Sequence, residues 1–294
     1  SAVKDQSTEC DQFADDTAVI TVNETPQEAE NGLQDSVNST SLWLSSWRQQ
    51  VNREKTVVME FTRRPLPRTV TVHLDSQPLA RVTDHKHLGI TLSSDLRWTA
   101  HIDRLLARAA PLLAALKRLR STLSRSALSA FYKVYIRPVL EYATLAWPVL
   151  PNHLTNRLET FQRRAAKIIL RLPLYTPSQH DAILQELGWH TLESRRLYRQ
   201  AILHMLAHGT APRHLLTESF PRRCMHHELR HTTHFDMPVT NSYMYQFSPL
   251  FVACATFNRL PCEAQEEPNI NKFKALAREA FLSDKCPCGA HIRM

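Results

Sequence analysis

Near its start the chain reads Phe13-Ala14-Asp15-Asp16, and the β-branched run Val19-Ile20-Thr21-Val22 follows closely. An aromatic and a small residue precede two adjacent carboxylates, and the run after them is a strand candidate. We therefore expect a tight hairpin with Asp15 and Asp16 at its turn. Two acids held in this way supply the oxygen ligands that Mg²⁺ prefers in two-metal phosphoryl-transfer sites. An Asp-Asp pair in a turn is also common without any site, so the pair alone does not decide a function.

Up to about residue 95 the sequence alternates between helix and strand patterns. Apolar residues recur at roughly helical intervals from Pro26 to Trp47, with acids in the first turn. Later runs are short, β-branched or alternating, and they are separated by turn residues such as Asp75-Ser76. The expected elements are a helix over 26–47, a strand over 56–61, and a hairpin of 70–74 with 79–82. The pattern predicts an α+β unit over residues 1–95.

Beyond about residue 98 the pattern becomes helical. The expected helices cover residues 102–119, 126–147, 154–171, 192–208 and 271–282. Pro111 lies inside the first of them, where we expect a kink or a new helix start. Residues 96–210 are therefore predicted to be a helical unit. Residues 211–294 are predicted to be a less regular extension with one short helix.

Charge is distributed unevenly. The chain has a formal net charge of +8, but residues 1–62 hold 11 Asp and Glu against 4 Lys and Arg. Residues 99–172 hold 13 Lys and Arg against 3 Asp and Glu. Basic stripes neutralise the phosphates of nucleic acids, although a solvated helix face is the other reading. The candidate contacts lie on one side of the first long helix and along one face of the third: Arg104, Arg108, Arg118, Arg163, Arg164, Lys167 and Arg171.

Several further motifs follow the acid pair in a fixed order. They are Trp47 with Val51-Asn52-Arg53-Glu54-Lys55-Thr56, then His87-Leu88-Gly89-Ile90, then Arg137-Pro138-Val139-Leu140-Glu141-Tyr142, and finally Phe257-Asn258-Arg259-Leu260-Pro261. The series resembles the reverse transcriptases of non-LTR (LINE-type) retrotransposons, and it covers nearly the whole chain. His87 stands where the family usually has a tyrosine, a departure that would alter the contacts at that position.

The resemblance implies a fold and a set of roles. Residues 1–95 would be part of an antiparallel polymerase palm and residues 96–210 a helical thumb. Asp15 and Asp16 would be the paired catalytic carboxylates that hold Mg²⁺. Lys55 would donate a proton to the departing pyrophosphate. Leu88, Gly89 and Ile90 would form the primer grip, and the partners would be an RNA template and a DNA primer.

The resemblance also implies parts that this sequence lacks. The family's site needs a third carboxylate from an upstream strand, together with the fingers that bind the nucleotide, so we expect a fragment that is inactive alone. An upstream polymerase and endonuclease segment would be the missing partner. Two alternatives remain open, namely a non-catalytic nucleic-acid-binding module and a helical protein-interaction module. No apolar stretch is long enough to cross a bilayer, and the scattered cysteines favour a reduced intracellular compartment, nuclear or cytoplasmic.

Overall fold

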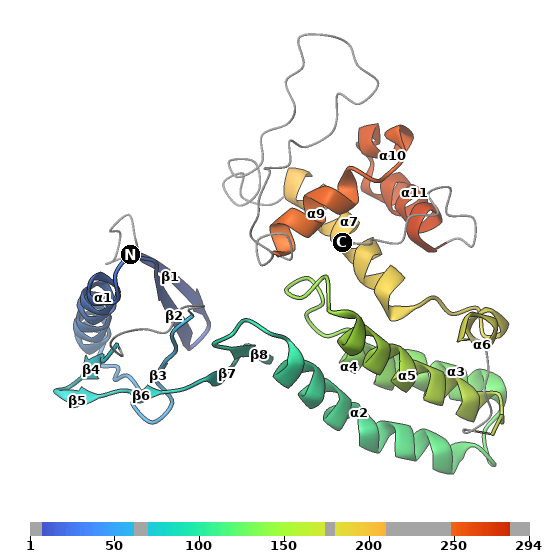
Figure 1. Cartoon of the computed structure of the whole chain (residues 1–294), viewed down its shortest axis with the longest axis horizontal. Coiled ribbons are helices and arrows are strands. Elements are labelled where there is room, and N and C mark those ends of the chain that lie inside the picture. The colour runs from blue at the N-terminus through green and yellow to red at the C-terminus, as the bar shows by residue number, and fades with distance from the viewer. Residues whose placement is uncertain (1–7, 62–69, 174–179, 210–247, 283–294) are drawn as a thin grey trace, which may run out of the picture. The chain divides into compact units, whose positions relative to one another are not determined.

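The computed structural model describes residues 8–61, 70–173, 180–209 and 248–282, and it divides the chain into two compact units, Ser1–His101 and Ile102–Met294. The first unit combines short strands with one long helix, and the second is helical (Figure 1). The sequence placed a boundary between residues 95 and 96. The second predicted boundary, between 210 and 211, lies outside the described residues.

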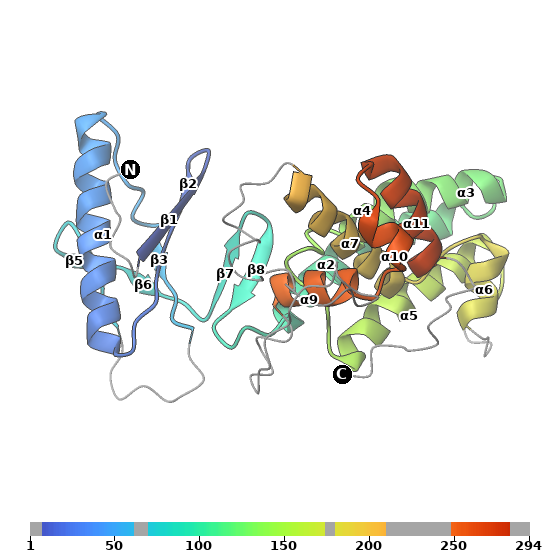
Figure 2. The ribbon, with the colours of Figure 1, turned by 90° about the horizontal axis from the view of Figure 1, so that it is seen from above.

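The first unit begins with an antiparallel hairpin that packs on a long helix. Strands β1 (Thr8–Phe13) and β2 (Asp16–Thr21) pair along their whole length, and α1 (Pro26–Ser46) follows. Thr25 caps α1, because its hydroxyl accepts from the backbone N–H of Glu28 while the Glu28 carboxylate accepts from that of Thr25. Figures 1 and 2 show α1 running beside the hairpin. Gly32 allows this approach, since a Cβ there would lie 3.0 Å from Cγ2 of Thr21.

The remaining strands of the first unit are short. They are β3 (Val57–Val58), β4 (His73–Leu74), β5 (Gln77–Pro78), β6 (Ala80–Arg81), β7 (Asp84–His87) and β8 (Ile90–Ser93). The described strands form four separate two-stranded sheets: β1–β2, β3–β6, β4–β5 and β7–β8, of which only β3–β6 is parallel. A small core of Val58, Val70, Val72, Leu74 and Leu79 packs against Leu33 and Val37 of α1. Of the strand expected over 56–61 only Val57–Val58 forms, so that prediction is mostly wrong. The expected hairpin of 70–74 with 79–82 is wrong in its second arm, because β4 pairs with β5, whereas β6 pairs with β3.

The second unit is built from helices. In chain order they are α2 (Thr99–Leu119), α3 (Arg125–Phe131), the π-helix η1 (Tyr132–Ile136), α4 (Arg137–Leu140), α5 (Asn152–Ile169), α6 (His180–Glu186), α7 (Leu192–Gly209), α9 (Pro249–Phe257), α10 (Cys262–Glu266) and α11 (Ile270–Leu282). Helix α7 packs on α5, α9 and α11. The largest fully buried side chains of this unit include Trp147, Tyr132 and Phe273. Among the described residues no helix is long and apolar enough to span a membrane.

The first helices of this unit differ in part from expectation. Of the kink or new start expected at Pro111, the new start is wrong, because α2 continues through the proline as one helix, and the kink stays a prediction. Pro111 and Ala107 are both exposed, so water can reach the carbonyl that the proline leaves unbonded. The helix expected over 126–147 ends early, because α4 stops at Leu140 and Ala143 adopts a positive φ of 52° in the turns that follow.

The C-terminal extension is more helical than predicted. Helices α9, α10 and α11 occupy most of Pro249–Leu282, where only the last helix was expected. Helix α9 is largely apolar and has no clear amphipathic period. Its residues Cys254 and Phe257 are buried in a cluster with Ala201 of α7 and Phe273 of α11, so most of the helix is shielded from solvent. A helix covered from several directions gives a sequence pattern that periodicity does not detect.

Candidate active site and nucleic-acid interface

The acid pair lies at the tip of the first hairpin, as the sequence predicts. Phe13 pairs with Asp16 as the last register of β1 and β2, so Ala14 and Asp15 form the turn between them. Ala14 has a positive φ of 55°, and its carbonyl accepts from Nε2 of Gln12 at 3.2 Å. Both carboxylates are exposed. The hairpin therefore presents two adjacent acids to solvent from one rigid turn.

The pair supplies part of a metal site. Carboxylate oxygens are suitable ligands for Mg²⁺, and neither side chain is buried against another group. Within the described residues, however, no group of three or more His, Cys, Asp or Glu side chains could hold a metal ion. Asp15 and Asp16 thus fit two of the carboxylate positions of a two-metal site, and the described residues supply no third.

Lys55 lies in a turn between α1 and β3. Its backbone N–H donates to Oδ1 of Asn52 at 3.2 Å, and the N–H of Thr56 donates to the Asn52 carbonyl at 3.1 Å. The Lys55 side chain is exposed. Asn52 therefore fixes the backbone at the position predicted to carry a proton donor, and the ammonium group remains in solvent.

The predicted primer grip is a second hairpin turn. His87 pairs with Ile90, so Leu88 and Gly89 form a two-residue turn between β7 and β8. Both have positive φ, 46° and 80°, which is the geometry of a type I′ hairpin turn. The N–H of Thr91 donates to Nδ1 of the buried His101 at 3.2 Å. The hairpin is thereby fixed to the start of α2.

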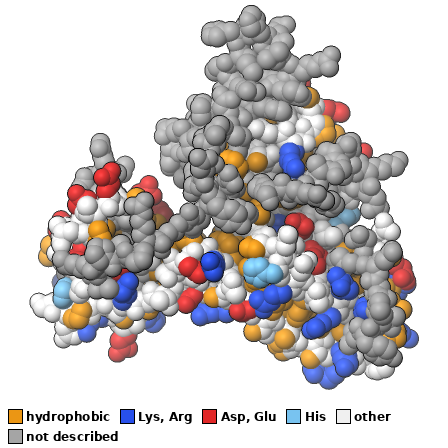
Figure 3. All heavy atoms as spheres, viewed as in Figure 1, with side chains coloured by type: hydrophobic (Ala, Val, Ile, Leu, Met, Phe, Trp, Pro, Cys, Tyr) orange, Lys and Arg blue, Asp and Glu red, His pale blue; other side chains and the backbone are white. Residues whose placement is uncertain are grey.

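Six of the seven predicted basic contacts face solvent at least in part, and five of them lie on α2 and α5. Arg104, Arg108 and Arg118 are exposed on α2, and on α5 Arg164 is exposed and Arg163 partly so. Figure 3 shows Lys and Arg side chains gathered over the part of the second unit where Figure 1 draws α2, α3 and α5. Arg157 of α5 is paired with Asp103 of α2, so the two helices are also joined by an ion pair.

The stripe predicted along α5 is wrong in two places. Lys167 is only 6% exposed, because α3, α6 and α7 pack on α5 and cover most of its circumference. Arg171 lies beyond the end of α5, with a positive φ of 59°, so it does not continue the helical face although it is exposed. The spacing of the basic residues correctly predicted a helix, but it did not reveal that other helices bury most of the surface of α5.

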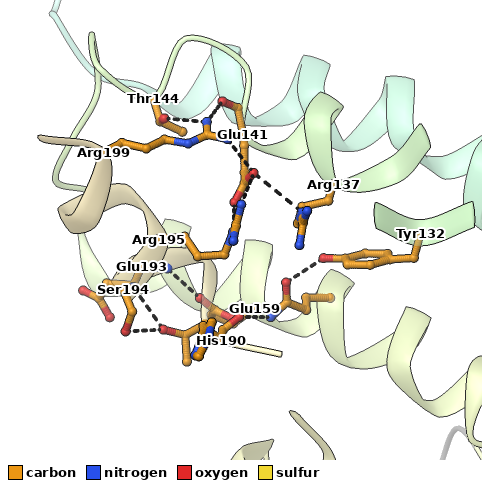
Figure 4. Close-up of polar contacts among 12 residues, drawn as sticks. Tyr132, Arg137, Glu141, Thr144, Glu159, His190, Glu193, Ser194, Arg195 and Arg199 are labelled. Carbon is orange, nitrogen blue, oxygen red and sulfur yellow. Dashed lines mark hydrogen bonds and ion pairs between the residues drawn. The ribbon is translucent and has the colours of Figure 1, made fainter. Parts of the chain in front are cut away.

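The second unit also contains a polar cluster that was not predicted from the sequence (Figure 4). Glu141, just after α4, has a side chain only 4% exposed and faces three arginines. Arg195 of α7 donates to both carboxylate oxygens, with Nε on Oε1 and Nη2 on Oε2 at 3.1 Å. Arg199 donates from Nη2 to Oε2 at 2.8 Å and from Nη1 to the Glu141 carbonyl at 2.9 Å. Nε of Arg137 lies 3.9 Å from Oε2.

The pKa values of two of these arginines are shifted in opposite directions. Burial lowers the pKa of Arg195, but the hydrogen bond and the charge of Glu141 outweigh burial, so the pKa is raised overall. For Arg137, burial and then the neighbouring charge of Arg195 leave the pKa below its ordinary value. One signal in the sequence could have revealed the cluster, because Glu141 is the only acid between Asp103 and Glu159 in a strongly basic stretch.

Comparison with known proteins gives relatives of one kind. The chain is 28% identical over 187 residues to the probable RNA-directed DNA polymerase from transposon BS of Drosophila melanogaster, which is 62% of this chain and 20% of that protein. It is 27% identical over 170 residues to the RNA-directed DNA polymerase from mobile element jockey of the same organism, covering 55% of this chain and 18% of the relative. The chain is a relative of the RNA-directed DNA polymerases of non-LTR retrotransposons. The probable polymerase from the Drosophila transposon X-element is similar at 27% identity over 163 residues.

The chain spans about a fifth of the length of these polymerases. No protein-family model matches it, and no solved structure does. The likeness to retrotransposon polymerases thus rests on sequence, and the resemblance stated from the motifs is confirmed at the level of the family.

Proposed function

We propose that this chain is the part of a non-LTR retrotransposon RNA-directed DNA polymerase that carries the paired metal-binding acids, the primer grip and the helical thumb. The first unit would be a partial palm. The observation that supports this most directly is the position of Asp15 and Asp16, side by side at an exposed hairpin turn in a chain whose relatives are RNA-directed DNA polymerases.

The chemistry would divide among the named residues. Asp15 and Asp16 would hold Mg²⁺, which stabilises charge on the attacking and leaving oxygens of phosphoryl transfer. Lys55, an exposed ammonium on a fixed turn, would offset the charge of the departing pyrophosphate and donate a proton to it. Leu88, Gly89 and Ile90 would position the primer strand, and the RNA template and DNA primer would lie against the basic helices inside the cell, in cytoplasm or nucleus.

We expect the isolated chain to be inactive, because a third carboxylate and the fingers would come from a preceding segment of the polymerase. The hairpin supports this expectation. Strands β1 and β2 form a sheet of their own, and Phe13, Ile20 and Val22 on or beside it are 67%, 49% and 76% exposed. A preceding segment could pair the edges of the hairpin with further strands and cover these side chains by packing on its exposed face.

Primer extension tests the proposal. The purified chain is incubated with a primed RNA template, Mg²⁺ and nucleotides, alone and with a preceding segment of polymerase supplied in the same polypeptide. We expect extension only from the longer polypeptide, and its loss in Asp15→Ala/Asp16→Ala. Extension that survives the double substitution would exclude the acid pair as the metal site. Extension by the isolated chain would show that no further carboxylate is needed.

A non-catalytic nucleic-acid-binding module is the second candidate, and the exposed basic face of α2 favours it. It predicts duplex binding that weakens with salt and is unchanged by Asp15→Ala/Asp16→Ala, with no extension from any longer polypeptide. Loss of extension without loss of duplex binding in the double variant would instead support the polymerase.

A further inference from the structure

The cluster around Glu141 holds more positive charge than it neutralises. One carboxylate, 4% exposed, faces Arg137, Arg195 and Arg199, whose side chains are 26%, 20% and 37% exposed. The negative group is therefore buried, while all three positive groups reach solvent. Partly buried charges of one sign in such excess are costly without a counter-ion.

The three arginines differ in how many of their side-chain N–H donors are already hydrogen-bonded. Arg195 and Arg199 are fixed by Glu141 and, from Nη1 of Arg199, by Thr144 at 3.2 Å. Arg137 is different, because its Nε approaches Glu141 only to 3.9 Å and its guanidinium makes no hydrogen bond to any residue that the structure describes. A guanidinium carries five N–H donors, and Nε of Arg137 faces Glu141, so the donors of Nη1 and Nη2 remain for a ligand. Figure 4 shows its guanidinium close to that of Arg195.

We propose that Arg137, together with Arg195 and Arg199, binds a phosphate group on the solvent side of Glu141. A planar guanidinium donates two parallel hydrogen bonds to a phosphate, and such charge-assisted bonds are about twice as strong as neutral ones. Glu141 acts as the positioning residue, since it fixes Arg195 and Arg199 before any ligand arrives. The added negative charge would offset the repulsion between Arg137 and Arg195, which lowers the pKa of Arg137 after the larger effect of burial.

The backbone of a nucleic acid is the source that the surroundings favour. Residues 99–172 carry 13 Lys and Arg against 3 Asp and Glu, so the approach to the cluster is electrostatically attractive to a polyanion. This identification of the source deepens the proposed function and rests on it. The phosphate site itself does not, because a free phosphate or pyrophosphate ion presents the same oxygens.

Two measurements on the full chain test the site, with Arg137→Gln as the variant and Arg278→Gln as the control. Arg278 is exposed on α11, outside the cluster, and its substitution changes the net charge equally. The first measurement is the rise in unfolding temperature caused by inorganic phosphate or pyrophosphate, relative to chloride at the same ionic strength. The second is the salt dependence of binding to a labelled RNA–DNA duplex.

We expect Arg137→Gln to abolish the phosphate-induced rise and to reduce the slope of log affinity against log salt by about 0.9, the value for one phosphate contact. Arg278→Gln should change neither. If phosphate stabilises the chain through Arg137 but no duplex binds, the site takes free phosphate and the nucleic-acid part of the proposed function is wrong. If the duplex binds equally to both variants and phosphate has no Arg137-dependent effect, the site is overturned and the proposed function stands.

A second substitution covers the case in which Arg137→Gln does not fold. Arg137→Lys keeps the charge but lacks the two parallel donors of the fork. We expect it to fold and to retain less than half of the phosphate-induced rise. A rise equal to that of the wild type in Arg137→Lys would show that no guanidinium-specific site exists there.

Discussion

The hydroxyl of Tyr132 donates a 2.6 Å hydrogen bond to Oε1 of Gln162 in the interior of the second unit. The Tyr132 ring also stacks on Trp189, with centroids 4.0 Å apart and planes inclined by 16°. Nε2 of Gln162 in turn donates to the carbonyl of His190 at 3.0 Å. One chain of contacts therefore joins the π-helix η1, α5 and the segment that leads into α7.

Removing the Tyr132 hydroxyl should destabilise the second unit. Tyr132→Phe leaves Oε1 of Gln162 without its donor in a buried position, which costs about 1–3 kcal/mol. The ring and its stacking on Trp189 are retained, so the change isolates the hydrogen bond. We expect a lower midpoint of urea unfolding, followed by tryptophan fluorescence. Tyr135→Phe, at a side chain 56% exposed, is the control and should change the midpoint little.

The same hydroxyl should make stability sensitive to alkali. Burial, and then the charge of Glu141, raise the pKa of Tyr132 above its ordinary value. In the unfolded chain the phenol ionises near about pH 10, whereas the folded protein keeps the proton. Its contribution is therefore complete below about pH 10 and is lost as the pH rises further, at up to roughly 1.4 kcal/mol per unit.

A comparison of unfolding at about pH 8 and about pH 11 checks this sign, since the tyrosine ionises between them. The free energy of unfolding of the wild type should fall more between the two than that of Tyr132→Phe, so the gap between the proteins narrows. A gap that stays constant would mean that the phenol ionises in the folded protein as it does in water.

Glu141 should be the costliest single polar substitution in the second unit. Glu141→Gln removes the negative charge from among Arg137, Arg195 and Arg199, and breaking a buried ion pair on one side typically costs about 3–5 kcal/mol. The control is Glu186→Gln, which breaks an exposed pair with Arg125 and should cost no more than about 1 kcal/mol. Equal losses in the two variants, measured by urea unfolding, would contradict a structural role for the cluster.

Local motifs were predictable because they depend on neighbouring residues alone. The Asp15-Asp16 turn followed from two acids before a β-branched run, and the structure places both at a hairpin tip. Helices α5, α7 and α11 were found within a few residues of their ends, and α5 and α11 are clearly amphipathic. Roles inherited from the family, such as proton donation by Lys55, stay predictions.

What sequence reasoning missed depends on contacts between distant segments. Lys167 has the spacing of a surface residue, but the packing of other helices on α5 buries it. Glu141 and Arg195 are 54 positions apart, so no pattern of neighbouring residues predicts their ion pair. Helix α9 has no clear amphipathic period, because its residues are largely apolar and most of them are buried, in part against α7. In each case packing between distant segments determines whether a side chain is buried or paired, and a single sequence does not predict that packing.

The exposed face of α2 gives the sharpest test of nucleic-acid contact. Arg104 and Arg108 lie one helical turn apart and are both exposed, so Arg104→Gln/Arg108→Gln should leave stability unchanged. If each contacts a phosphate, the slope of log affinity against log salt for an RNA–DNA duplex should fall by about 0.9 per arginine, with no change in sequence preference. The control Lys272→Gln/Arg278→Gln removes the same charge from exposed positions of α11. If both double variants lowered the affinity for the duplex equally, net charge and not the α2 face would account for binding. A direct contact, by contrast, depends on where on the protein the charge is removed.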